Sequence, residues 1–313
     1  MRSIENVESR KEKWSTDYYY QDTNDYSFIK KLIWIYFILL LTEGALRKWL
    51  LPNLSQALLI IRDPFVIWIY FLAIQRNLFP TNNKYIKFLS KITILACFTS
   101  IIINGTHPAL IFYGIHTNYL HMPLIFVMWK TLDKNEVIKF GKVILFCGFF
   151  MTWLVTEQFT AEREGILNVG VGGTGFQLET SGGKIRASGT FSFVTGIVYY
   201  YCFAVAFVLY GFINGKAIPK WLILLGAASS LLAMVTAGSR GLIAECLQVV
   251  ACIAILLYKK PTEFKKIATS IFGFTVVGLI LYSQYDLFKT GITFLEMRFE
   301  DAENVEGNPV EAY

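Results

Sequence analysis

Arginine occurs in two short motifs that are suited to binding phosphate. Arg186 begins the segment Arg-Ala-Ser-Gly-Thr-Phe, and Arg240 lies in the turn Gly-Ser-Arg-Gly. An arginine side chain stays charged and presents a planar set of donors that matches phosphate oxygens better than an ammonium group does. The small residues beside them, including Ser188 and Ser239, would let a bulky headgroup approach the backbone amides. Together the two motifs favour a site for a phosphate-containing ligand.

Each arginine also has an ordinary structural explanation. Either one could anchor at a membrane interface or neutralise the negative end of a helix. Glu245 follows Arg240 on the same apolar stretch and could orient its side chain. The shared setting of the two arginines, rather than either one alone, favours a functional role.

Further ionisable residues lie deeper in apolar sequence. Glu43 and Arg47 are four residues apart, so they share one helix face and can pair. Arg62 and Asp63 occur inside a second apolar stretch, where a charged group usually faces the protein interior or a water-filled cavity. A structural pair and a substrate-binding role remain open for Arg47 and for Arg62.

Three histidines, His107, His116 and His121, surround one apolar stretch. His121 or His116 is a candidate proton acceptor. Zinc sites need a better-defined cluster of ligands than the sequence shows, so we expect no bound metal. The cysteines all fall in apolar stretches without a Cys-x-x-Cys pair, which predicts buried free thiols.

The glycine-rich segment 165–183 contains a literal Gly-x-Gly-x-x-Gly at Gly170, Gly172 and Gly175. A dinucleotide site requires a strand before these glycines and a helix after them, in a soluble βαβ unit. Here the loop is expected to lie outside the membrane, where nicotinamide cofactors are not supplied. We therefore interpret the segment as a flexible loop.

The elements that must position these residues are apolar stretches of membrane-spanning length. The chain is 54% hydrophobic with a mean hydropathy of +0.47, which is too apolar for a soluble domain of this size. About 20 apolar residues cross a bilayer as a helix. We therefore predict an all-α integral membrane protein with about nine transmembrane helices, at residues 28–49, 54–75, 88–104, 111–130, 136–157, 189–212, 219–237, 241–258 and 267–285.

The distribution of basic residues predicts the orientation of these helices. Most of the 29 Lys and Arg residues fall on the side of the N-terminus, which the positive-inside rule makes cytoplasmic. These residues, beside anionic lipid headgroups, also account for the net charge of +6, so we expect no nucleic-acid partner. On the outer side we place Arg47, Lys48, Arg62, Arg163, Lys184, Arg186, Arg240, Lys289 and Arg298.

Three regions follow from this orientation. Residues 1–27 form a polar cytoplasmic segment, residues 28–285 form the transmembrane domain with an outer glycine-rich loop at 158–188, and residues 286–313 begin an outer loop that ends extracytoplasmically. In the last region Phe288, Ile292 and Leu295 recur at helical spacing, which predicts a short amphipathic helix on the membrane surface.

At its arginine motifs the sequence resembles the O-antigen polymerase and O-antigen ligase superfamily of bacterial envelope glycan enzymes. The matching elements are residues 186–191 at the start of an apolar stretch, the turn at 238–241, and a long outer loop after a later stretch. The resemblance implies a multi-span glycosyltransferase of the GT-C type on the outer face of the bacterial inner membrane. Its substrate would be a polyprenyl diphosphate-linked glycan, transferred to an acceptor glycan or lipid without a cofactor.

The resemblance also implies roles for individual residues. Arg186 and Arg240 correspond to catalytic arginines that bind the carrier diphosphate. We expect the substrate-binding residues to be Arg47, Arg62, Ser188, Ser239, Glu245 and His121. In the family a large outer loop and closing helices follow the ninth stretch, so we expect this chain to be an incomplete form that is inactive by itself. A lipid-linked glycan flippase and a non-catalytic remnant are the alternatives.

Overall fold

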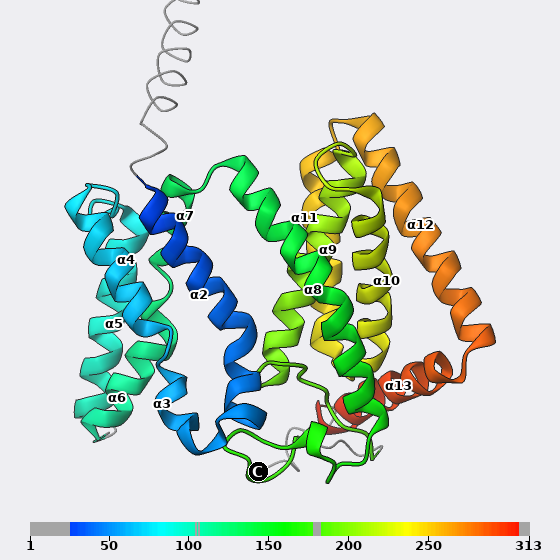
Figure 1. Cartoon of the computed structure of the whole chain (residues 1–313), viewed down its shortest axis with the longest axis horizontal. Coiled ribbons are helices and arrows are strands. Elements are labelled where there is room, and N and C mark those ends of the chain that lie inside the picture. The colour runs from blue at the N-terminus through cyan, green and yellow to red at the C-terminus, as the bar shows by residue number, and fades with distance from the viewer. Residues whose placement is uncertain (1–25, 104, 106, 178–182, 307–313) are drawn as a thin grey trace, which may run out of the picture. The chain divides into compact units, whose positions relative to one another are not determined.

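The computed structural model describes residues 26–103, 105, 107–177 and 183–306. These residues form helices joined by turns and loops (Figure 1). Among them there is one isolated antiparallel bridge, between Val169 and Phe176, and no strand. The predicted all-α class is therefore confirmed.

Within the described residues, six helices are long and apolar enough to cross a membrane. Each coincides with one of the predicted stretches, so the chain has the character of a multi-pass membrane protein. Their bounds are Pro52–Gln75, Lys84–Ile102, Lys134–Thr160, Val194–Ile213, Arg240–Leu257 and Pro261–Gln284. The first of these spans is helical on both sides of a turn at residues 60–62.

Three predicted stretches have a different local structure, so the count of nine membrane helices stays a prediction. Helix α2 (Ser27–Ala45) includes three charged residues, Lys30, Lys31 and Glu43, and α10 (Lys220–Thr236) has only 17 residues. The stretch at 111–130 is not one continuous helix. It is divided into α6 (Pro108–Ile115), the π-helical turn η3 (His116–Leu120) and α7 (Leu124–Thr131).

The chain folds as two compact units, and α2 contributes to both. Among the described residues, unit 1 comprises those within 26–37 and 63–132, and unit 2 comprises those within 38–62 and 133–306. The described helices of unit 1 after α2 are α4 (Asp63–Gln75), α5 (Lys84–Ile102), α6 and α7. Unit 2 contains η1 (Leu46–Leu50), η2 (Pro52–Leu54), α3 (Ser55–Leu59), α8 (Lys134–Thr160), η4 (Ile166–Asn168), α9 (Val194–Ile213), α10, α11 (Arg240–Leu257), α12 (Pro261–Gln284) and α13 (Asp286–Glu306).

The core of unit 2 lies where α8, α9 and α10 pack together. Tyr201 is fully buried there, and its hydroxyl hydrogen-bonds with Thr152 Oγ1 at 2.6 Å. The neighbouring Tyr200 donates its hydroxyl hydrogen to the Ile144 carbonyl at 2.6 Å. Because these polar atoms have partners, their burial among apolar side chains carries little penalty.

The segment between residues 183 and 193 is a buried loop rather than the first turn of a membrane helix. Its Gly189 amide donates to Gln158 Oε1 at 2.8 Å, and Thr190 Oγ1 donates to the Leu41 carbonyl at 2.7 Å. Gly189 has φ +56°, and a Cβ there would lie 2.6 Å from Met151 Sδ. Both the backbone conformation and the lack of space therefore require glycine. Helix α9 begins only at Val194, five residues after the predicted start.

Helix α13 differs from the predicted surface helix in what its apolar face contacts. Phe288, Phe294 and Leu295 are buried, and Phe294 packs edge-on against Phe159 with ring centroids 5.6 Å apart. A Cβ on Gly291 would overlap the Val235 side chain of α10. Because Gly291 lacks this atom, α13 lies directly against the end of α10, and its apolar face packs on protein.

Gly44 provides a test of how tightly α2 packs in unit 2. A Cβ at this position would overlap the Thr190 carbonyl oxygen, a backbone atom that cannot rotate away. We therefore expect Gly44→Ala to lower the free energy of unfolding by ~1–3 kcal/mol, the usual cost of overpacking. The matched control is Gly273→Ala in α12, where nothing lies within 4 Å of the added Cβ. This change should be neutral or stabilising, since alanine favours helix.

Thermal unfolding in detergent, followed by a dye that reacts with newly exposed thiols, measures both variants. Equal unfolding temperatures for Gly44→Ala and Gly273→Ala would show that the close contact between α2 and the loop does not exist.

Candidate functional site

Three arginines from separate parts of unit 2 come together at one place. Arg186 lies in the buried loop before α9, Arg240 is the first residue of α11, and Arg298 belongs to α13. Burial, followed by the positive charges of Arg298 and Arg240, lowers the pKa of the Arg186 guanidinium. Since charges influence one another in this way only at short range, Arg186 lies near Arg298 and Arg240. That Arg186 and Arg240 form one substrate site stays a prediction.

The three side chains have no acidic partner among the residues that the structure describes. Arg186 Nε and Arg298 Nε are both buried without a hydrogen-bond partner there. Arg240 lies over the ring of Phe299, with its guanidinium carbon 6.0 Å from the ring centroid. Like charges held together repel, so an anion with several oxygens would stabilise this group by accepting from more than one arginine. We call Arg186, Arg240 and Arg298 the arginine cluster.

Glycines position two members of the arginine cluster. Gly238, at the turn between α10 and α11, has φ +60°, and a Cβ there would lie 2.5 Å from the Phe294 ring. Phe294 can therefore pack directly on the turn that carries Arg240. Arg298 follows Phe294 by four residues and so lies on the same face of α13. Sequence reasoning placed Arg298 only on the outer side, although its spacing from Phe294 was the available signal.

Arg47 and Arg62 belong to a different network, in which Glu43 compensates their charges. Arg47 Nη1 lies 3.2 Å from Glu43 Oε1, and Arg62 Nε lies 2.6 Å from Glu43 Oε2. Arg47 also donates to the Ser55 carbonyl at 2.9 Å and to Ser192 Oγ at 3.0 Å. The Glu43–Arg47 pair expected from helical spacing is present, and these contacts favour its structural role.

The remaining predicted substrate-binding residues of unit 2 are less accessible than expected. Ser188 is only 2% exposed and donates its hydroxyl hydrogen to Gln177 Oε1 at 2.9 Å. Ser239 is also buried, directly before α11. Glu245 is half-buried on α11 and forms no ion pair with Arg240 among the described residues. The substrate-binding role of these three residues stays a prediction.

Lys48 is a functional candidate that sequence reasoning placed merely on the outer side. It lies in η1, outside the six membrane-length helices, and is 2% exposed. Its ammonium group donates to Ser188 Oγ at 2.5 Å and to the Gly189 carbonyl at 3.4 Å. Burial lowers the pKa of Lys48 to about 7, so this side chain exchanges a proton near neutral pH. Nothing in the sequence distinguished it from the neighbouring Arg47.

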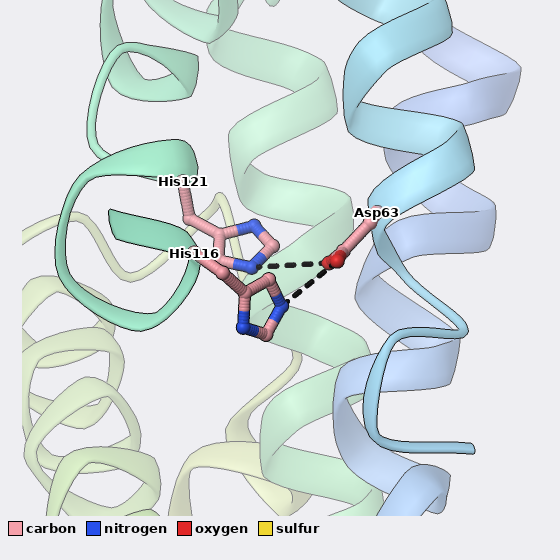
Figure 2. Close-up of side chains that lie close together, drawn as sticks. All are labelled: Asp63, His116 and His121. Atoms are coloured by element: carbon pink, nitrogen blue, oxygen red, sulfur yellow. Dashed lines mark ion pairs between the residues drawn. The ribbon is translucent and has the colours of Figure 1, made fainter. Parts of the chain in front are cut away.

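His121, the last predicted substrate-binding residue, lies in unit 1. There it forms a cluster with His116 and Asp63 (Figure 2). Asp63 is far from both histidines in the sequence. His107 is exposed at the start of α6 and is not part of this cluster.

Known proteins do not identify the family of this chain. No protein-family model, curated protein or solved structure matches it. The resemblance to O-antigen polymerases and ligases therefore stays a prediction, and the function has to be inferred from the residues themselves.

The low pKa of Lys48 predicts a specific dependence of stability on pH. Between about pH 7 and its ordinary pKa of 10.5, unfolding lets Lys48 bind a proton that the folded chain does not hold. This contribution makes the free energy of unfolding rise with pH across that window. Lys48→Met lacks the group, so we expect the variant to be more stable than wild type at pH 7 and to lose this advantage by pH 10.

The control is Lys216→Met, which removes an exposed lysine of unit 2. Thermal unfolding of the three proteins at several pH values measures the effect. A constant difference between Lys48→Met and wild type from pH 7 to 10 would mean that Lys48 is charged in the folded protein.

Proposed function

We propose that this chain is an O-antigen polymerase- or ligase-like protein of the bacterial inner membrane. It takes a glycan from a polyprenyl diphosphate carrier and joins it to an acceptor glycan or lipid on the outer face. The observation that supports this proposal is the arginine cluster, which brings three half-buried cations together without an acidic partner among the described residues.

The chemistry of such a transfer matches the cluster's charge. An acceptor hydroxyl attacks the anomeric carbon of the donor sugar, its proton passes to a base, and the bond between that carbon and the diphosphate oxygen breaks. Negative charge then develops on the leaving diphosphate. Fixed cations in a partly dry site stabilise this charge more than water does, because they need no reorganisation during the reaction.

The apolar helices are also compatible with a lipid-linked donor. A polyprenyl tail partitions into hydrocarbon, so its diphosphate is held at the membrane surface, where the proposed orientation places Arg186, Arg240 and Arg298. Nucleotide sugars are made inside the cell, whereas a lipid-linked donor can supply glycan outside it. The multi-span GT-C type of fold is part of this proposal.

A lipid-linked glycan flippase is the second candidate. The observation that favours it is the interruption of the segment 108–131 by η3 and a turn beside ionisable residues, since broken membrane helices often form transport sites. The two classes differ in their product. A transferase cleaves the bond to the diphosphate and extends or ligates a glycan, whereas a flippase moves the intact donor between leaflets.

The two candidates are distinguished with a form of the protein completed by the outer loop and closing helices that the resemblance implies. Membranes that contain this completed form are incubated with a labelled polyprenyl diphosphate oligosaccharide. Longer or ligated glycan together with released carrier supports the transferase. Movement of intact donor across the bilayer without any cleavage would contradict it and assign the flippase.

Substitution of the cluster should weaken binding of the carrier. We expect Arg186→Lys and Arg240→Lys each to reduce the affinity for undecaprenyl diphosphate in nanodiscs by ~10–100-fold, because lysine keeps the charge but loses the paired donors. In a transfer assay of the completed form, the same substitutions should lower the rate by ~10²–10³-fold.

Arg163→Lys is the matched control, because Arg163 is an exposed arginine of the connection between α8 and α9. Its affinity should equal that of wild type. Unchanged binding by Arg186→Lys and Arg240→Lys would exclude the cluster as the diphosphate site, and an equal loss for all three would indicate general charge attraction.

The orientation on which the proposal depends can be tested by cysteine labelling. In a background without the native cysteines, Glu164→Cys should react with an impermeant maleimide in intact cells, because the basic residues place this connection outside. Gly215→Cys, in the connection after α9, should react only after permeabilisation. The opposite result would place the arginine cluster on the cytoplasmic side and contradict the proposed donor.

A further inference from the structure

Two membrane segments of unit 1 are irregular at the positions of their ionisable residues. Helix α4 begins at Asp63, directly after turn residues 60–62. In the segment 108–131, His116 begins the π-helical turn η3, and His121 lies in the turn between η3 and α7. Ionisable groups in apolar segments and π-helical turns are both frequent at functional sites. Here both features coincide at one cluster.

Asp63, His116 and His121 point toward one another (Figure 2). His116 Nε2 lies 2.8 Å from Asp63 Oδ2, and His121 Nε2 lies 3.6 Å from Asp63 Oδ1. One ligand atom from each residue lies within 4.8 Å of the others. A single ion placed among them would therefore contact two imidazole nitrogens and a carboxylate.

Hydrogen bonds do not account for this arrangement. His116 Nδ1 and Nε2 and Asp63 Oδ1 are buried and form no hydrogen bond within the described residues. The 2.8 Å contact between His116 and Asp63 has the distance of an ion pair but not the direction of an N–H···O bond. Buried polar atoms almost always have a partner. The described protein atoms do not provide one for these atoms, so a ligand is expected to do so.

Tyr36 supports a ligand role for His121 from the other side of its ring. Tyr36 Oη lies 3.4 Å from His121 Nδ1. If Nδ1 carries the hydrogen and donates it to Tyr36, Nε2 presents its lone pair toward Asp63. Metal-binding histidines are oriented in this way, with the second ring nitrogen hydrogen-bonded to a neighbour.

We propose that Asp63, His116 and His121 bind one divalent transition-metal ion, with zinc as the best match. Two histidines and a carboxylate are the protein ligands of open zinc sites, in which a water or substrate takes the fourth position. Ligands of a tetrahedral zinc lie ~3.3 Å apart, given bonds of about 2.0 Å. The contacts of 2.8 and 3.6 Å to Asp63 bracket this value, so small side-chain rotations complete the site.

The exposure of the cluster fits an open site. The side chains of His121 and Asp63 are 21% and 15% exposed, whereas that of His116 is 8% exposed. A fourth ligand can thus reach the ion from the side of His121. This site belongs to unit 1, and the inference does not depend on glycan transfer by the arginine cluster of unit 2.

Zinc titration of the full chain tests the proposal. The protein is purified with a tag that lacks histidine, stripped with a chelator, and titrated with Zn²⁺ against a competing chelator. We expect one ion per chain for wild type and a loss of affinity above ~100-fold for Asp63→Asn, His116→Gln and His121→Gln, since each removes a ligand. Tyr36→Phe should weaken binding by ~10–100-fold, as loss of a ligand's orienting partner does.

The matched control is His107→Asn, because His107 is exposed, lies outside the cluster, and accepts from the Ala109 amide at the start of α6, a role that asparagine can keep. It should bind zinc as wild type does. X-ray absorption of zinc-loaded wild type tests the ligand set without any variant and should show imidazole nitrogen and carboxylate oxygen.

Three results would overturn the proposal. The first is no stoichiometric binding by wild type, and the second is an equal loss in His107→Asn. The third is an absorption spectrum dominated by sulfur or lacking imidazole.

Discussion

A charged side chain in apolar surroundings needs a partner, and this constraint organises the polar interior of the protein. Glu43 satisfies it for Arg47 and Arg62, with contacts of 3.2 and 2.6 Å. Lys48 meets it with only a hydroxyl and a carbonyl, which is why its pKa falls. The basic residues Arg47, Arg62 and Lys48 differ in how completely their charge is compensated, and that difference separates structural residues from functional candidates.

The residues around the arginine cluster are positioned by backbone segments that pack closely at glycines. Gly44 brings α2 against the loop that follows residue 183, and Gly291 brings α13 against α10. These contacts bring residues that are far apart in the sequence close together, and they do so by backbone packing rather than by polar side chains. The arginine cluster is therefore held by packing on its apolar side, and its charged groups remain available to a ligand.

Hydropathy and charge were sufficient to predict the helices but not their irregularities. A periodic apolar stretch indicates a helix, so α5, α8 and α12 could be located from sequence. The interruption of residues 111–130 was not predicted, because the length and the overall hydropathy of the stretch still match a membrane helix. The polar residues of η3, such as His116 and Asn118, and Pro123 after it were the available signal. That interruption decides which way His116 and His121 face. The relation of His116 and His121 to Asp63 was therefore not predicted, whereas Arg186 and Arg240 were assigned to one site because small residues adjoin both of them.

The close-packed glycines also set how this chain can vary over evolutionary time. At Gly44, Gly189 and Gly291 an added methyl group would meet protein atoms, whereas Gly273 and Gly278 face open space. Mutation can replace Gly273 and Gly278 without a steric clash. At the other three positions the lack of space requires glycine, whatever reaction the protein carries out. Distant descendants of the same ancestor would thus share a spacing of glycines long after their charged residues had diverged, and this spacing would be the last trace of common ancestry.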